Sequence, residues 1–190
     1  MKSMLFLLCL VMPAAPALAA DTAPLPSESL YQVDARLTDQ DGSLLAWSDL
    51  RGQPRVVSMF YTHCHLMCPM ILESGKALQK QLAADGHRIE VDMLSLDPER
   101  DIPAVLKQTA ADHRLDMRDW RLLRPAQNDV RALAASLDVR YRQQPDGSFS
   151  HTSVLVLLDA DGRPLARSEV VGLQPDPAFV EQVRQTLAAR

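Results

Sequence analysis

The stretch 56–82 constrains the fold most strongly, because it reads as a strand, a short loop and a helix in that order. An apolar run ending at Tyr61 predicts a buried strand. From Pro69 onward apolar residues recur at helical spacing, and proline suits the first helical turn, where its missing N–H costs nothing. Cys64 is therefore expected in the loop and Cys68 at the start of the helix.

This placement favours ionised thiols. Free backbone N–H groups and the helix dipole stabilise a thiolate at a helix start. The spacing of Cys64 and Cys68 puts both sulfurs on one side if the first turn is helical. Two soft ligands on one side are part of a copper(I) site, and the same pair could close a disulfide. The alternative is that both are small hydrophobic residues without a shared role.

The rest of the chain alternates strand and helix patterns. Strands are predicted at 31–37, 44–47, 55–61, 89–96, 120–123, 154–158 and 165–170, and helices at 69–82, 102–114, 129–137 and 177–187. This order is typical of a thioredoxin-like α/β fold, with a central mixed sheet flanked by helices and an N-terminal β-hairpin. One antiparallel strand is expected from the closing hairpin. Sites in such sheets form beyond the carboxyl ends of the strands, where Cys64 lies.

The N-terminus has the features of a secretory signal peptide at residues 1–19. Lys2 precedes an apolar run, and an A-x-A cleavage site ends at Ala19. The run is too short to span a bilayer. Cleavage after Ala19 predicts a periplasmic protein, and the alternative is a membrane tether formed by an uncleaved N-terminus. Residues 20–30 read as a flexible lead, and 31–190 as one domain.

Cysteine usage and charge narrow the function. Cleavage removes Cys9, so the mature protein keeps Cys64 and Cys68 of its 3 cysteines. One pair in an exported protein is not a disulfide scaffold, and it needs a periplasmic thiol reductant to stay reduced. The formal net charge of −4, made more negative by loss of Lys2, argues against nucleic acid or an anionic membrane as partner.

His151 could complete a metal site. It directly precedes the predicted strand 154–158. If that strand runs antiparallel to the cysteine strand, the loop entering it reaches the same end of the sheet. An imidazole and two thiolates would make a three-coordinate copper(I) site, and a fourth ligand would suit copper(II). The alternative for a single histidine before a strand is a surface or turn position. His87 and His113 lie in polar surroundings, and we assign them no function.

At this point the sequence resembles the Sco/SenC family. Four motifs in the family's order and spacing carry the resemblance over nearly all of the mature chain: Cys64-x-x-x-Cys68-Pro69, Leu96-Asp97-Pro98-Glu99-Arg100-Asp101, Trp120-Arg121-Leu122 and His151-Thr152-Ser153. The family comprises thioredoxin-fold copper-binding proteins of the periplasm and the mitochondrial inner membrane. They serve assembly of the dinuclear copper centre of cytochrome oxidase, and some act as thiol–disulfide reductants.

The resemblance implies that Cys64, Cys68 and His151 bind copper. It further implies that Asp97 and Asp101 lie near these ligands and tune them without contacting the metal. The interpretation from the residues alone is different. In it the strand ends at this segment, a proline turns the chain, and Asp101 caps the helix predicted at 102–114.

The chain departs from the family pattern within the cysteine loop. Many members have a proline after the first cysteine, where this chain has His65. His63, Met67 and Met70 add further imidazole and thioether groups that could bind copper. The alternatives are core packing for Met70 and solvent-facing loop positions for His63 and His65.

Two functions of different classes follow. The first is a copper chaperone, a binding protein that passes copper by ligand exchange to an oxidase subunit or another copper enzyme. The second is a thiol–disulfide oxidoreductase, in which Cys64 and Cys68 form a redox pair that reduces a copper-site client. Against the second, the spacing is one residue longer than C-x-x-C, and His151 stands where thioredoxins place a proline. A peroxidase is the weakest alternative, because Thr62-x-Cys64 lacks the T-x-x-C spacing.

Overall fold

A computed structural model gives the structure of residues 24–63 and 67–189, and for residues 67–69 of the main chain only. The predicted signal peptide at 1–19, the first part of the predicted lead, Cys9, Cys64 and His65 lie outside the described residues.

Seven strands of the described chain form one mixed sheet in the order β2-β1-β5-β4-β3-β8-β9. The central strands β3, β4 and β5 are parallel. β8 pairs antiparallel with β3, and β1 pairs antiparallel with β5. The predicted mixed sheet and N-terminal hairpin are confirmed, and the hairpin adds a second antiparallel junction to the one predicted. The strands are β1 (Arg36–Asp39), β2 (Leu44–Ala46), β3 (Arg55–Phe60), β4 (Glu90–Ser95), β5 (Trp120–Pro125), β8 (Leu155–Leu158) and β9 (Pro164–Ser168).

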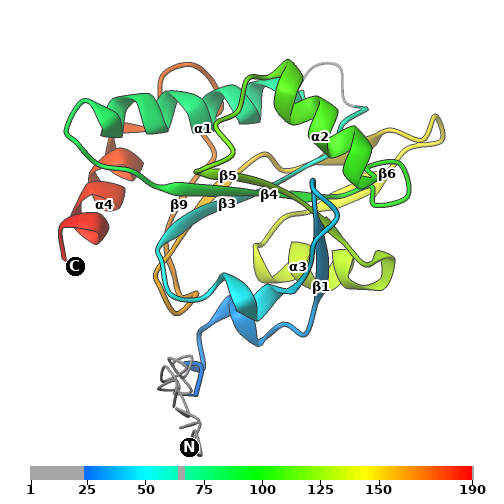
Figure 1. The fold of residues 1–190 in the computed structure, drawn as a ribbon, viewed down its shortest axis with the longest axis horizontal. Coiled ribbons are helices and arrows are strands. Elements are labelled where there is room, and N and C mark those ends of the chain that lie inside the picture. The colour runs from blue at the N-terminus through cyan, green and yellow to red at the C-terminus, as the bar shows by residue number, and fades with distance from the viewer. Residues whose placement is uncertain (1–23, 64–66, 190) are drawn as a thin grey trace, which may run out of the picture.

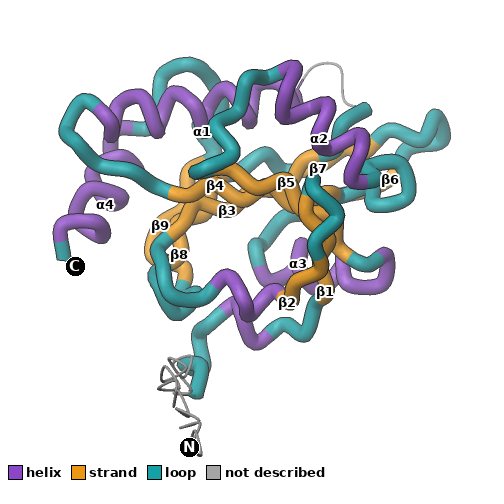
Figure 2. Tube along the Cα trace, in the orientation of Figure 1, coloured by secondary structure: helices purple, strands orange, loops and turns teal. Residues whose placement is uncertain are grey.

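Helices cover both faces of this sheet. α1 and α2 cross one face and α3 lies on the other, while α4 packs beside α1 and β9 (Figures 1 and 2). The helices are α1 (Met67–Ala83), α2 (Pro103–Asp112), α3 (Val130–Ser136) and α4 (Pro177–Ala188), with short 3-10 turns η1 (Leu30–Gln32), η2 (Trp47–Leu50) and η3 (Gln127–Asp129). Among the described residues, none of the helices has the length and apolar character needed to cross a membrane.

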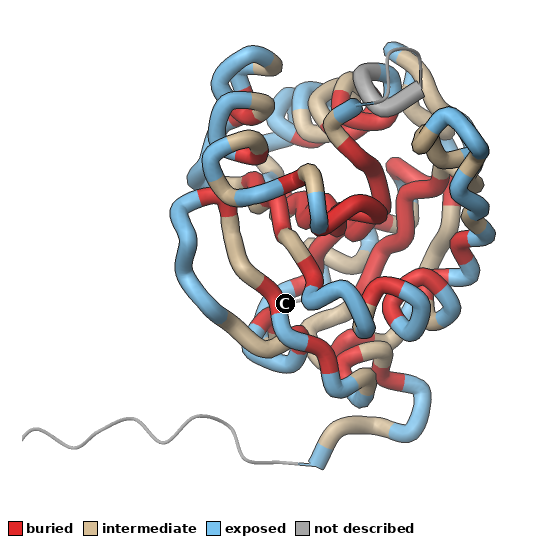
Figure 3. Tube along the Cα trace, turned by 90° about the vertical axis from the view of Figure 1, so that its right-hand side faces the viewer, coloured by how far each residue is buried: buried red, intermediate tan, exposed pale blue. Residues whose placement is uncertain are grey.

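The core lies between these layers, as the buried segments in the centre of Figure 3 show. Every residue of β3 and β8 is buried, as are all but the first of β4. A strand covered on both faces needs apolar residues throughout rather than at alternate positions. The continuous apolar runs read from the sequence therefore become the central strands, and they fix where β3 ends and the cysteine loop begins.

The N-terminal segment differs from the prediction. Residues 31–37 were expected to be extended, but η1 occupies their start and β1 begins only at Arg36. Tyr31 is drawn into the core, where its ring lies edge-on to Trp47 at 5.2 Å. Ser29 caps η1 and donates a hydrogen bond of 2.5 Å to the Asp161 carbonyl. The end of the predicted flexible lead is thus packed against the domain.

A separate two-stranded sheet stands beside the main one. β6 (Tyr141–Gln143) and β7 (Phe149–His151) pair antiparallel around a turn that contains Gly147 at φ +81°. The sequence analysis predicts no strand at β7. His151 is the last residue of β7, so it belongs to a hairpin rather than to an irregular loop.

Candidate metal centre

The N-terminus of α1 carries the second cysteine. α1 begins at Met67, so Cys68 is its second residue, as the sequence predicts. Cys64 lies outside the described residues, between the end of β3 and this helix. The main chain of Cys68 thus lies in the first turn of α1, where a helix leaves its N–H groups without intrahelical partners.

Close packing against β5 fixes α1 on the sheet. A Cβ at Gly75 would lie only 2.6 Å from the indole of Trp120, so the helix approaches the sheet where it has no side chain. The same indole donates a hydrogen bond of 2.6 Å to Gln79. These contacts hold α1 close to the sheet and so help to fix the position of its first turn.

The structure brings His151 to this end of the sheet. Its ring centroid lies 5.9 Å from that of Tyr61, which directly follows β3 and precedes Cys64 by three residues. The predicted antiparallel course of β8 beside β3 explains how a late segment reaches this position. The ring is partly buried, and burial lowers the pKa of His151 against a smaller opposing effect from the Thr152 carbonyl.

The hydrogen bond to Thr152 also selects a tautomer. Nδ1 of His151 lies 3.1 Å from the Thr152 carbonyl oxygen. Because a carbonyl only accepts, Nδ1 carries the proton, and Nε2 is the ring nitrogen with a lone pair for a metal. Metal-ligating histidines commonly donate their other N–H to a carbonyl or a carboxylate, which fixes the ring. A neutral imidazole of this tautomer fits a metal ligand.

The Asp97–Asp101 segment follows β4 and is held tightly. Asp101 is fully buried and accepts hydrogen bonds from the Thr62 hydroxyl at 2.5 Å, the Thr62 N–H at 3.2 Å and the Ser95 hydroxyl at 2.5 Å. Burial raises the pKa of the Asp101 carboxyl, and the hydrogen bonds from Ser95 and Thr62 oppose that rise. Asp101 therefore anchors the chain two residues before Cys64.

Asp101 does not cap α2, which corrects the prediction. The residue before the helix is Ile102, which has no side-chain cap, and Pro103 occupies the first helical position. The chain turns one residue later than the sequence suggests. The Asp101 side chain is thereby directed to Thr62 rather than to the first turn of α2.

Arg100 joins the same segment to the histidine hairpin. It forms an ion pair with Asp97, and its guanidinium donates to the Gly147 carbonyl at the tip of the β6–β7 hairpin. Asp97 is itself 6% exposed. The segment Asp97–Asp101 therefore contacts two arms of the site: the cysteine arm, which is the chain before Cys64, and the histidine arm, which is the β6–β7 hairpin that carries His151. The sequence analysis assigned no role to Arg100 or Gly147. The signal for Arg100 was its place in the family-like motif 96–101.

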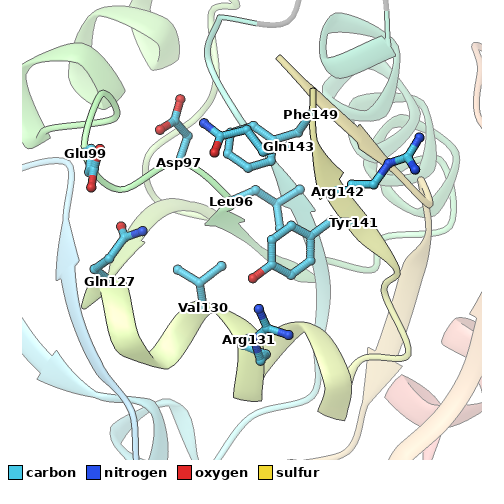
Figure 4. A pocket seen from close by; sticks show the side chains of 10 residues that line it. All are labelled: Leu96, Asp97, Glu99, Gln127, Val130, Arg131, Tyr141, Arg142, Gln143 and Phe149. Atoms are coloured by element: carbon cyan, nitrogen blue, oxygen red, sulfur yellow. The ribbon is translucent and has the colours of Figure 1, made fainter. Parts of the chain in front are cut away.

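A cavity of about 390 Å³ lies between the segment after β4, the β6–β7 hairpin and α3. Figure 4 shows Asp97 on one side and Tyr141 across from it, with Phe149 beside Gln143. The described lining combines two carboxylates, two guanidinium groups, two amides and two aromatic rings: Leu96, Asp97, Glu99, Gln127, Val130, Arg131, Tyr141, Arg142, Gln143 and Phe149. Tyr141 and Phe149 of the hairpin pack against the core, and specific hydrogen bonds add to that packing.

The remaining predicted residues are placed as follows. His63 is exposed, and its Nδ1 lies 3.2 Å from the Thr62 hydroxyl. Met70 is 37% exposed, so the alternative of core packing is wrong for this residue. His65 lies outside the described residues, as does the side chain of Met67.

Comparison with known proteins shows what the whole sequence is similar to. The SCO1/SenC family model matches residues 25–188. The SCO1 protein homolog of Bacillus subtilis is 28% identical over 158 residues, which cover 81% of this chain and 82% of that protein.

Solved structures share the fold. BsSco, described as a member of the Sco family of cytochrome c oxidase assembly proteins with a disulfide switch, is 26% identical. It superposes with a TM-score of 0.69 and covers 83% of this chain and 94% of its own. Copper-bound ScoI of Bradyrhizobium japonicum is 24% identical, with a TM-score of 0.66 over 81% and 98% of the two chains. These matches confirm the thioredoxin-like fold. Because the family model spans most of the sequence, including both cysteines and His151, the chain belongs to the SCO1/SenC family.

Proposed function

We propose that the protein is a periplasmic copper chaperone. In this proposal it binds copper through Cys64, Cys68 and His151 and delivers it to a copper-centre enzyme such as cytochrome c oxidase. The observation that carries the proposal is the 5.9 Å separation between the Tyr61 and His151 rings. It brings an imidazole from late in the chain to the strand end from which the cysteine loop departs.

The chemistry of the donors fits this cargo. Thiolates select copper(I), and imidazole suits both copper oxidation states. Ligands must be deprotonated to bind a metal. The first-turn position of Cys68 and the lowered pKa of His151 both favour the deprotonated forms near neutral pH. The copper-bound ScoI structure supports the same cargo, and the description of BsSco supports an oxidase as recipient.

Delivery proceeds by ligand exchange. Cysteines or histidines of the acceptor displace Cys64, Cys68 and His151 one at a time, so copper is never released to water. A recipient with more soft ligands, or with better-arranged ones, drives the transfer. Export by the predicted signal peptide at 1–19 would place the protein in the periplasm, and a thiol reductant there would keep the pair reduced. N-terminal sequencing of the exported protein that began at Met1 would instead support a membrane tether.

The test is an anaerobic copper(I) titration against a competing chelator. Wild type should bind one equivalent, and Cys64→Ser and Cys68→Ser should abolish competitive binding. His151→Ala should weaken binding by more than the roughly 10–100-fold typical of a group that only supports a ligand. His87→Ala is the matched control, and its affinity should stay within about twofold of wild type. Reduced wild type that binds no stoichiometric copper would end the proposal.

A second candidate is a thiol–disulfide oxidoreductase. The helix-start position of Cys68 favours it, because a lowered thiol pKa makes a better attacking group. The disulfide switch described for BsSco points the same way. Loss of client reduction in Cys64→Ser together with full activity in His151→Ala would favour this candidate over the chaperone.

A further inference from the structure

The pairing between β3 and β8 ends before the site. Its register runs from Arg55↔Leu158 to Val57↔Val156, and β3 then continues to Phe60 without β8 as a partner. Two hydroxyl groups continue where these main-chain bonds end. The Ser58 hydroxyl donates to the Val154 carbonyl at 2.6 Å.

The second hydroxyl belongs to Tyr61. It donates to the Phe149 carbonyl at 3.1 Å and accepts from the Phe149 N–H at 3.2 Å. One phenol thus bonds both main-chain groups of the first residue of β7. The Tyr61 ring also lies edge-on to the rings of Phe149, at 5.3 Å, and of His151, at 5.9 Å.

We propose that Tyr61 is the positioning residue for His151. Its hydroxyl fixes β7 to the carboxyl end of β3 and thereby holds the imidazole beside the chain that leads to Cys64. The consequence for copper rests on the proposed function, whereas the placement of the ring is a property of the metal-free protein.

The need for such a residue follows from the size of the hairpin. β6 and β7 each have three residues, and an isolated two-stranded hairpin is at best marginally stable in water. Its position therefore depends on contacts with the domain. Tyr61 is 3% exposed and Phe149 is half-buried, so the bonds between them are partly shielded from water. Loss of the hydroxyl leaves a partly shielded N–H and C=O of Phe149 without this partner, which favours opening of β7.

Tyr61→Phe tests this with the ring kept in place. Tyr31→Phe is the matched control, because Tyr31 is also buried, at 2% exposure, and its hydroxyl donates a hydrogen bond of 3.3 Å to the Leu50 carbonyl and lies within hydrogen-bonding reach of Arg55, not of the hairpin. Tyr31 packs on Trp47, away from the hairpin. Both variants lose a buried phenol hydroxyl, but only one loses the contact with β7.

The first readout uses metal-free protein. Hydrogen exchange at the Phe149 amide should accelerate about tenfold or more in Tyr61→Phe, the change expected for loss of one net hydrogen bond. The ring nitrogens of His151 should shift toward a mixture of tautomers in proton–nitrogen correlation spectra. Tyr31→Phe should keep the exchange rate of the Phe149 amide within about twofold of wild type and should leave the His151 ring signals unchanged. Unchanged exchange and unchanged ring signals in Tyr61→Phe would overturn the proposal.

A measurement on wild type keeps the proposal testable if Tyr61→Phe does not fold. The Tyr61 hydroxyl proton should exchange slowly enough to give a resolved signal with a nuclear Overhauser effect to the Phe149 amide proton. A hydroxyl proton in rapid exchange with water would contradict the described bonds and the proposal with them.

The copper readout separates the two proposals. Tyr61→Phe should lower copper(I) affinity about tenfold, toward the value for His151→Ala, while its thiols react with a disulfide reagent at the wild-type rate. If wild type binds no copper but Tyr61→Phe still loosens His151, the proposed function fails and the positioning role stands. If wild type binds copper through His151 and Tyr61→Phe leaves the metal-free ring unchanged, the positioning role fails alone.

Discussion

Substitution of Asp101 by Asn tests whether this carboxylate anchors the cysteine loop. The side chain is fully buried, and three donor groups from Thr62 and Ser95 converge on it. Asn keeps the size of the side chain and one acceptor oxygen. If that oxygen faces Thr62, the new NH₂ group faces the Ser95 hydroxyl. An NH₂ group cannot accept a hydrogen bond, so the Ser95 hydroxyl proton loses its acceptor, while the Ser95 oxygen still accepts the bond of 2.9 Å from the Asp97 N–H.

The magnitude follows from these contacts. The variant loses one hydrogen bond to a charged group, worth about 1.5–3 kcal/mol, and turns those from Thr62 into neutral ones worth about 1 kcal/mol each. Removing a buried charge offsets part of this loss. We expect the free energy of unfolding to fall by about 2 kcal/mol at pH 7. For a domain of this size that corresponds to a Tm lower by about 4–8 °C.

Urea unfolding of the metal-free protein, with the slope compared between variants, measures this change. Asp49→Asn is the control, because Asp49 is exposed and accepts one hydrogen bond of 2.7 Å from the Ala46 N–H. It should cost less than about 1 kcal/mol, within the range for a single neutral hydrogen bond. A loss for Asp101→Asn no larger than that of the control would refute the reasoning from burial and convergence.

The same variant decides what Asp101 does for the metal. If the carboxylate holds the chain before Cys64 in position, copper(I) affinity should fall by about 10-fold or more, as for partners that orient ligands. Unchanged affinity with a lower Tm would restrict Asp101 to a role in folding, and would remove it from the candidate site.

Three further predictions concern the frame of the site. Gly75→Ala should lower the free energy of unfolding by about 1–2 kcal/mol, because the clash with Trp120 outweighs the gain in helix propensity, and a variant more stable than wild type in urea would contradict this. Arg55→Met should cost about 3–5 kcal/mol by leaving Asp92 buried without its 2.6 Å ion pair, and Arg55→Met/Asp92→Leu should recover most of that loss in thermal unfolding. The raised folded pKa of Asp101 means that its stabilisation is fully present below the unfolded pKa of about 4 and declines as pH rises through the folded pKa. The gap in stability between wild type and Asp101→Asn should therefore narrow from pH 4 to pH 7, and a widening gap in urea titrations would contradict the sign.

Sequence patterns predict the central strands well because burial on both faces demands unbroken apolar runs. β3 and β8 are buried at every position, and both lie within one residue of their predicted bounds. The start of the domain shows the limit of this reasoning. Tyr31 alternates with polar neighbours as in a strand, yet it is in η1, because its ring packs on Trp47 and against the turn at Gly162. A tertiary contact of that kind leaves no local signal.

The candidate site also has one part that the sequence predicts and one part that it does not. The cysteines are recognisable because a strand, a loop and a helix adjoin them in sequence. The contacts that hold the His151 hairpin in place cannot be recognised from the sequence, because they join distant residues. Tyr61 bonds Phe149 across 88 residues, and Arg100 bonds Gly147 across 47. β7 is short and partly polar, so no periodicity distinguishes it from a loop. What sequence predicts is which groups could bind a metal, and what it misses is how their distances are fixed.

The segment after β4 contacts both the chain before Cys64 and the histidine hairpin. β4 lies next to β3 in the sheet, so the turn at Asp97–Asp101 emerges beside the end of β3. From there Asp101 holds Thr62 on the cysteine side, and Arg100 holds Gly147 on the histidine side. A displacement of this one turn would move both arms, whereas loss of the Tyr61 hydroxyl would move only the histidine arm. Asp101→Asn should therefore alter both thiol reactivity and the His151 ring signals, and Tyr61→Phe only the latter.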